Sequence, residues 1–168
     1  HINLVNTQNA FIRGNIIWRM PYGIVLDGAI NTRIYDNWVE GIWDLNYVAA
    51  QEGIADVLFI GTSQHCQLAK LRGNYFSGAV NSTRNTTYSD GVNSVIKSYV
   101  SNVGSQNNLL VISCEDIDIS GNYFGRASLG LIRLAPSTGN SIVLDVRITD
   151  NLFDNAGSGP EGYQITVT

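Results

Sequence analysis

The stretch Ile119-Ser120-Gly121-Asn122-Tyr123-Phe124 decides the fold, because its pattern returns four more times in the chain. The pattern is an apolar residue, any residue, Gly or Asp, then Asn, any residue and a second apolar residue. The other copies begin at Ile12, Ile34, Leu71 and Ile148. Five copies in 168 residues indicate a repeat architecture.

The distances between the repeated asparagines give the period. Asn15, Asn37, Asn74, Asn122 and Asn151 are separated by 22, 37, 48 and 29 residues. Because 48 is twice 24, we place a hidden copy at Val95–Val100, with Ser98 in the place of the asparagine. The period is then about 22–24 residues, and insertions are expected around residues 43–56 and 136–141.

The apolar positions of each copy alternate with period two, which is typical of a β-strand. Gly or Asp before the asparagine suits a turn with unusual backbone dihedrals. Most repeats hold a second strand-like run, at residues 23–26, 57–60, 109–112, 129–132 and 163–167. The sequence therefore predicts an all-β parallel β-helix of about six or seven coils, a single domain over residues 1–168, with the asparagines stacked in a ladder. A leucine-rich repeat has a similar period but lacks its L-x-x-L-x-L core here, and a β-sandwich does not explain the fixed phase of the asparagines.

Composition and charge exclude several classes. Apolar residues make up 44% of the chain and charged residues 14%, which excludes a coiled coil and a charge-driven disordered chain. The net charge of −4, with ten Lys and Arg, gives no footprint for nucleic acid. No apolar run reaches the ~18 residues that span a bilayer, so no membrane insertion is expected. The chain begins with His1, and we expect a piece of a longer protein.

The only cysteines are Cys66 and Cys114, each eight residues before a ladder asparagine. With the hidden copy between them they are expected two coils apart, about 9–10 Å, which is too far for a disulfide. We predict two reduced thiols in the core and, for lack of ligands, no metal site.

The five motifs resemble the repeats of the right-handed, pectin-lyase-like β-helix superfamily, which includes pectate lyases, polygalacturonases, alginate lyases and bacteriophage tailspikes. The Gly-His-Gly and paired-aspartate motifs of polygalacturonases are absent from this sequence. The irregular coils and the many Asn, Ser and Thr are most similar to a phage tailspike or capsule depolymerase. That resemblance implies recognition, and cleavage, of a bacterial capsule or O-antigen polysaccharide by a homotrimer on the virion tail, with no cofactor. A secreted location is the alternative.

The first candidate site is the segment from residue 38 to 56, which combines aromatic and acidic residues around the long insertion. Aromatic rings can stack on sugar faces, so we predict Trp38, Trp43 and Tyr47 as substrate-binding residues. The alternative is a loop that packs its own aromatics on the coils or on a neighbouring subunit.

Carboxylates are candidates for acid and base catalysis, since glycosidases use pairs about 5–10 Å apart. The catalytic candidates are Asp27, Glu40, Asp44, Asp90 and Glu115. Asp27 follows a strand and precedes Gly28, so it can equally cap a turn. Asp90 and Glu115 are expected on nearby coils.

Cationic residues share one phase, four positions before the asparagine. Arg33 and Lys70 are predicted to contact substrate, with Arg147 and Asp118 in the same row. The alternative is a solvated, salt-bridged row.

Three functions remain open from the sequence: a tailspike-like depolymerase, a secreted bacterial polysaccharide lyase or hydrolase, and a structural or adhesive β-helix without catalysis.

Overall fold

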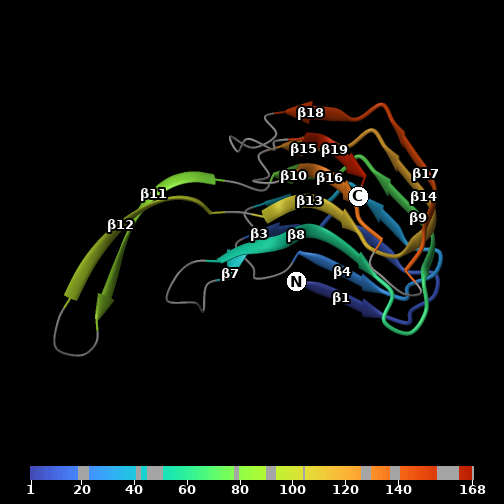
Figure 1. Ribbon diagram of the computed structural model, residues 1–168, viewed down its shortest axis with the longest axis horizontal. Coiled ribbons are helices and arrows are strands. Elements are labelled where there is room, and N and C mark those ends of the chain that lie inside the picture. Colours follow the sequence, from blue (N-terminus) through green and yellow to red (C-terminus); the bar gives the residue numbers. More distant parts are fainter. Residues whose placement is uncertain are drawn as a thin grey trace.

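The computed structural model describes residues 1–18, 23–40, 43–44, 51–77, 80–89, 94–103, 105–125, 130–136, 141–154 and 163–167. Short strands from successive repeats stack into parallel sheets, and one long hairpin extends away from them (Figure 1). Nothing in these residues forms a helix, and hence none long and apolar enough to cross a membrane.

Three parallel sheets, which we call A, B and C, form the body. Sheet A contains β1 (Ile2–Val5), β4 (Ile24–Asp27), β8 (Gln51–Ile60), β13 (Ser105–Val111), β16 (Gly130–Leu134) and β19 (Tyr163–Val167). Sheet B contains β2 (Phe11–Arg13), β5 (Arg33–Tyr35), β9 (Cys66–Arg72), β14 (Cys114–Ser120) and β17 (Val143–Thr149). Sheet C contains β3 (Ile16–Trp18), β6 (Trp38–Glu40), β10 (Tyr75–Ser77), β15 (Tyr123–Gly125) and β18 (Leu152–Asp154).

The chain visits the sheets in the order A, B, C, and each visit pairs in parallel with the one before it. This is a parallel β-helix, as the repeat predicts. The described strands make five complete coils, and β19 adds a strand to sheet A beyond the fifth. The predicted count of six or seven coils is too high.

The excess coil comes from the hidden copy at Ser98, which is not a coil. Residues 95–100 belong to β12 (Ser94–Val103), which pairs antiparallel with β11 (Val80–Ser89) in a hairpin between β10 and β13. In the register of the pair, Ser98 lies opposite Asn85. The gap of 48 residues is therefore one coil plus a hairpin, because strand alternation alone does not distinguish a coil strand from a hairpin strand.

The predicted asparagine ladder is present at the bend between sheets B and C. Two residues connect the sheets at every coil, and the second is the asparagine. Each asparagine's backbone N and Nδ2 donate to the Oδ1 of the next, as from Asn37 to Asn74 at 3.0 and 2.9 Å. From the second coil on, Nδ2 also donates to a backbone carbonyl of the preceding coil, such as Ile12 O for Asn37. Every polar atom of a central amide is thereby paired.

The residue before each asparagine has a positive φ, as predicted from its identity. Asp36 has φ 55° and Gly73 has φ 67°, and the equivalent residues of the other coils lie between 55° and 67°. Glycine adopts this region freely, and Asp tolerates it better than most residues.

The core lies between the sheets. Inward residues three before and two after each asparagine stack on their equivalents, as the alternation predicts; Ile34 and Val39 are fully buried. Phe76, Phe124 and Phe153 form an inward stack with ring centroids 5.2 and 5.7 Å apart. Burying such side chains contributes roughly 1.5–3 kcal/mol each before entropy costs.

The insertions gather between strands, as expected. Ten residues separate β6 from β8, within which β7 (Trp43–Asp44) pairs antiparallel with the start of β8. The second expected insertion lies between β16 and β17, where the offset between paired residues grows from 23 to 29 (Asn107 pairs with Gly130, Cys114 with Val143).

Candidate functional site

Sheets B and C carry the exposed features of the described coils, and their chemistry differs. The outward positions of sheet C are mainly aromatic, and those of sheet B are mainly cationic. Since outward residues of paired parallel strands stack about 4.7–4.9 Å apart, each face presents continuous rows of side chains.

The first row of sheet C holds the residue that follows each ladder asparagine. Trp38 stacks on Tyr75 with ring centroids 4.5 Å apart, and Tyr75 stacks on Tyr123 at 4.5 Å with an interplanar angle of 3°. Ile16 and Leu152 extend the row at either end, with exposed fractions of 80% and 63%. We call these five residues the aromatic row. It is an apolar platform across five coils, and its tryptophan is 47% exposed.

A second row beside it supplies carboxylates. Glu40 accepts a hydrogen bond from Trp38 Nε1 at 2.8 Å, and Asp154 accepts one from Tyr123 Oη at 2.8 Å. Gly125 lies between them in this row, where an added Cβ would meet Tyr123 Oη at 2.7 Å. The glycine lets the tyrosine lean across its own strand towards Asp154, so the ring orientations are held from outside the stack.

Glu40 and Asp154 do not form a catalytic pair on one bond. Their strands are separated by β10 and β15, so three strand spacings, about 14 Å, lie between them. Glycosidase carboxylates are about 5–10 Å apart.

Only part of the predicted 38–56 site can be placed. Trp38 and Glu40 lie together on sheet C. Trp43 and Asp44 lie on β7, whose side chains are outside the described part, and Tyr47 is outside the described residues. Asp56, named with this segment for its charge, is instead fully buried and accepts a hydrogen bond from Asn108 Nδ2 at 2.7 Å.

The cationic row of sheet B is present in the predicted order. Arg33 pairs in register with Lys70, and Asp118 pairs with Lys70 on one side and Arg147 on the other. Phe11 precedes Arg33 in the same row. We call these five residues the cationic row.

Ion pairing does not neutralise this row. Within the described residues the one ion pair is Arg13 Nε to Asp36 Oδ2 at 3.0 Å, which lies beside the row. There, the side chains of Arg33, Lys70 and Arg147 have no hydrogen-bond or ion-pair partner. The salt-bridged alternative is therefore not seen in this part of the chain.

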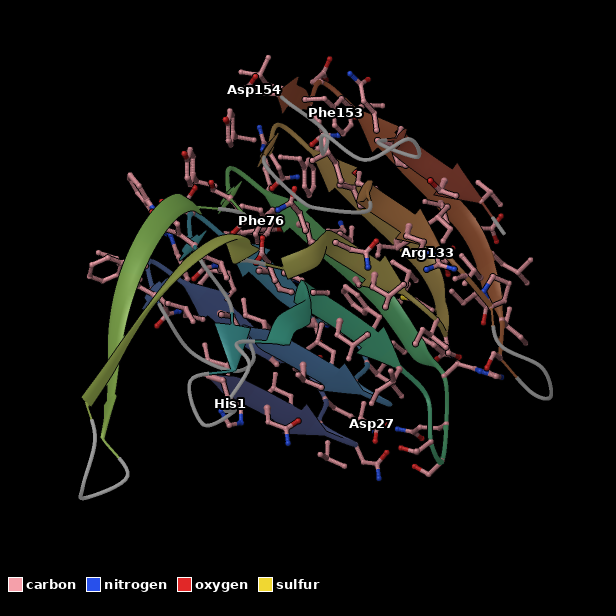
Figure 2. All side chains as sticks on the ribbon, turned by 60° about the vertical axis from the view of Figure 1, so that its left-hand side comes forward. His1, Asp27, Phe76, Arg133, Phe153 and Asp154 are labelled. Carbon is pink, nitrogen blue, oxygen red and sulfur yellow. The ribbon has the colours of Figure 1, made fainter. Side chains whose placement is uncertain are left out.

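Asp27 is placed at the bend between sheets A and B, and its oxygens hold a loop. Oδ1 accepts from the backbone N of Thr62 at 2.8 Å, and Oδ2 accepts from the Thr62 hydroxyl. Gln64 and Ser63 of the same loop bond to Gly28 O and Asn6 Oδ1. This is the capping geometry that the sequence allowed. Figure 2 shows Asp27 at the opposite end of the molecule from Asp154.

The other two carboxylate candidates are not brought together on stacked coils. Asp90 lies outside the described residues, after the last residue of β11. Because the copy at Ser98 is a hairpin strand, the expected coil position of Asp90 is wrong. Glu115 lies on sheet B, with Oε2 at 3.5 Å from Gln67 Nε2.

The two cysteines are on adjacent coils rather than two coils apart. Cys66 and Cys114 are register partners of β9 and β14, and both are buried free thiols, as predicted. Burial raises the pKa of each thiol, so neither supplies a thiolate near neutral pH. Among the residues with described placement, no group of three or more His, Cys, Asp or Glu is arranged to hold a metal ion.

The sequence contained signals for the residues it missed. Tyr75 and Tyr123 occupy the same phase as Trp38, one residue after the asparagine, and Asp154 occupies the phase of Glu40. Reading the outward phases as rows would have found both.

The fold and its outward faces define a class: a parallel β-helix that presents an aromatic and a cationic face. Comparison of the chain with family models, with curated proteins and with solved structures finds no match.

Proposed function

We propose that the protein binds a bacterial surface polysaccharide, of the capsule or O-antigen kind, along the aromatic row of sheet C. The observation that supports this most is the exposed stack of Trp38, Tyr75 and Tyr123. Sugar rings present apolar faces of C–H groups, and exposed aromatic rings with polar atoms at their edges suit them.

The geometry favours a long ligand over a small one. The aromatic row crosses five strands, which at one strand spacing per step is about 19 Å from the first to the last. Glu40 and Asp154 lie at its side and retain acceptor capacity for sugar hydroxyls beyond the bonds to their ring partners. A polymer contacting several rows at once gains from each ring without requiring a deep pocket.

Cleavage of the bound chain is the second activity that we propose, with Glu40 as the carboxylate at the platform. Its hydrogen bond to Trp38 places it where a bound sugar would lie. Asp44, only four residues further along the chain, is the predicted partner. The setting that we propose is a tailspike-like homotrimer on a virion tail; a secreted lyase or hydrolase and a non-catalytic adhesive module are the alternatives.

The experiment measures binding of the purified chain to a panel of capsule and O-antigen polysaccharides. Trp38→Ala and Tyr75→Ala should each weaken binding roughly tenfold, the loss of about 1.4 kcal/mol. Tyr75→Phe should keep it, because the ring stack remains. Tyr35→Ala, which removes a tyrosine from sheet B, is the matched control and should have no effect.

The same panel tests cleavage by following new reducing ends and the ultraviolet absorbance of unsaturated sugars. Reducing ends that vanish in Glu40→Gln support hydrolysis at this face, and reducing ends with absorbance indicate a lyase. Binding without either signal would overturn cleavage and leave recognition. No binding to any polymer, or equal loss in Tyr35→Ala, would overturn the proposed function itself.

A further inference from the structure

The outer face of sheet B combines exposed cations with open depressions. Three depressions lie along this sheet, with volumes of about 240, 440 and 350 Å³. Each is lined by at least one member of the cationic row: Arg33 in the first, Lys70 and Arg147 in the second, and Arg147 in the third. In a chain of net charge −4, cations without partners on one face indicate a ligand of opposite charge.

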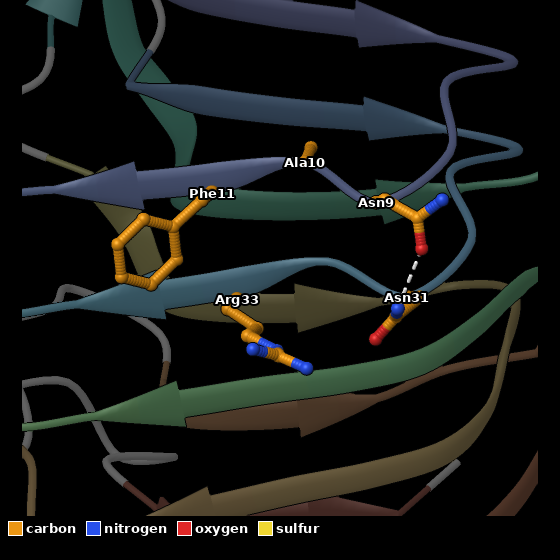
Figure 3. Close-up of a pocket in the computed structure, with 5 residues that line it drawn as sticks. All are labelled: Asn9, Ala10, Phe11, Asn31 and Arg33. Carbon is orange, nitrogen blue, oxygen red and sulfur yellow. Dashed lines mark hydrogen bonds between the residues drawn. The ribbon is translucent and has the colours of Figure 1, made fainter.

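The first depression shows the chemistry most clearly (Figure 3). Phe11 and Arg33 line one side of it, and Asn9 and Asn31 the other, the latter two joined by a hydrogen bond of 2.7 Å. Phe11 is 57% exposed, and its ring meets Tyr35 edge to face with centroids 5.6 Å apart. An aromatic ring, a guanidinium and amides together suit a sugar that carries a carboxylate.

The second depression repeats this combination two coils further on. Lys70 and Arg147 lie on either side of Asp118, and Leu68 beside them is 49% exposed. Leu68 has φ 54°, at a bend where the equivalent residues of the other coils are Asn or Asp. The bend therefore presents an exposed apolar side chain next to two free cations.

We propose that the outer face of sheet B is a second binding surface, for a linear acidic polysaccharide whose sugar carboxylates contact Arg33, Lys70 and Arg147. These three residues span three strand spacings, about 14 Å along the row. Arginine matches the planar carboxylate with two parallel hydrogen bonds. This surface is separate from the aromatic row, and its ligand need not be the ligand of sheet C.

A nucleic acid fits the face less well. Asp118 interrupts the row, and Asp36, Asp116, Asp145 and Asp150 flank it at the bends. Carboxylates at this density repel a backbone with a phosphate at every step, whereas a polysaccharide that alternates acidic and neutral groups can align its charges with the cations.

The test measures affinity of the whole chain for polygalacturonate at about 50 mM NaCl, with dextran, dextran sulfate and duplex DNA as comparison polymers. Polygalacturonate should bind, dextran should not, and binding should fall steeply at about 300 mM NaCl because exposed charges are screened. Dextran sulfate or DNA binding as tightly as polygalacturonate would overturn the assignment to sugar carboxylates.

Three variants locate the surface. Lys70→Gln combined with Arg147→Gln should weaken polygalacturonate binding roughly tenfold or more. Arg13→Gln is the matched control, because it removes an arginine of the same sheet whose charge is already paired with Asp36. Asp118→Asn should strengthen binding, since it removes the negative charge from the row; a gain of affinity cannot result from misfolding.

The outcomes separate this proposal from the function proposed for sheet C. Trp38→Ala should leave polygalacturonate binding unchanged, and loss in that variant would assign the acidic polymer to the aromatic row instead. Unchanged binding in the Lys70 and Arg147 double variant, with the native thermal transition retained, would overturn the proposal. So would equal loss in Arg13→Gln, or weaker binding in Asp118→Asn.

Discussion

The bend between sheets B and C and the connection from sheet C back to sheet A differ in almost every respect. The first has two residues in every coil and a paired amide at its centre. The second has from 4 to 27 residues between strands, and it includes both β7 and the hairpin β11–β12. The chain tolerates a change of more than twenty residues at one corner of the coil and none at the other.

This difference shows what specifies the register. Where the amides stack, a one-residue insertion would leave a buried donor or acceptor unpaired on both neighbouring coils, at about 1–3 kcal/mol for each group. At the other corner the connecting segments leave the body, so extra length adds only a slowly growing closure entropy.

The largest effect is expected from breaking the ladder at its centre. Asn74→Ala removes the acceptor for Asn37 and the donor to Ile34 O, and it unpairs Asn122 Oδ1. We expect a loss of about 3–5 kcal/mol in the free energy of unfolding, measured by denaturant titration.

The control is the same substitution at the first step of the ladder. Asn15 is partly exposed, and water can replace part of what Asn15→Ala removes, so the expected loss is about 1 kcal/mol. Equal losses at the two positions would mean that the amide network does not stabilise the bend more where it is buried.

A smaller effect is expected from the residue before the asparagine. Gly73→Ala keeps the backbone but places a Cβ 2.6 Å from Asp36 Oδ1 at φ 67°, and we expect a loss of about 2 kcal/mol in thermal or chemical unfolding. Gly121→Ala has φ 61° and no heavy atom within 4 Å of the new Cβ. It should lose only about 1 kcal/mol, so the difference between the two measures the contact with Asp36 apart from the dihedral.

The smallest effect is expected at the variable corner. Replacing residues 80–103 by about ten Gly and Ser residues halves the connection, which changes the closure term by about 0.6 kcal/mol. A two-stranded hairpin on its own is marginally stable, so its removal should leave the unfolding free energy within about 1 kcal/mol. A loss of several kcal/mol in the same titration would show that the hairpin is part of the core.

The repeat allowed the fold, the ladder and the inward residues to be predicted, because each depends on a local pattern of a few residues. The hidden copy failed for a physical reason. Residues 95–100 alternate in the same way as a coil strand, and their partner in the antiparallel pair is a neighbouring segment that no periodicity marks. What was missing at Ser98 was the carboxamide, and its absence was the better indicator.

The candidate site was predicted less completely. Trp38 and Glu40 were found from composition, and Arg33 and Lys70 from phase. Tyr75 and Tyr123 went unnoticed because they were examined as members of separate motifs, although a shared phase in a parallel stack makes them neighbours. The capping geometry of Asp27 depends on a loop 35 residues away, which no local pattern reveals.

The asparagine ladder also restricts how two copies could meet end to end. Every rung turns its amide donors towards the following coil and its Oδ1 towards the preceding one, so the two ends of the stack differ as a plug differs from a socket. A twofold axis would set donor against donor or acceptor against acceptor. Any continuation of the ladder between copies would have to be head to tail, a form of contact that closes on itself only when the rotation between copies allows it.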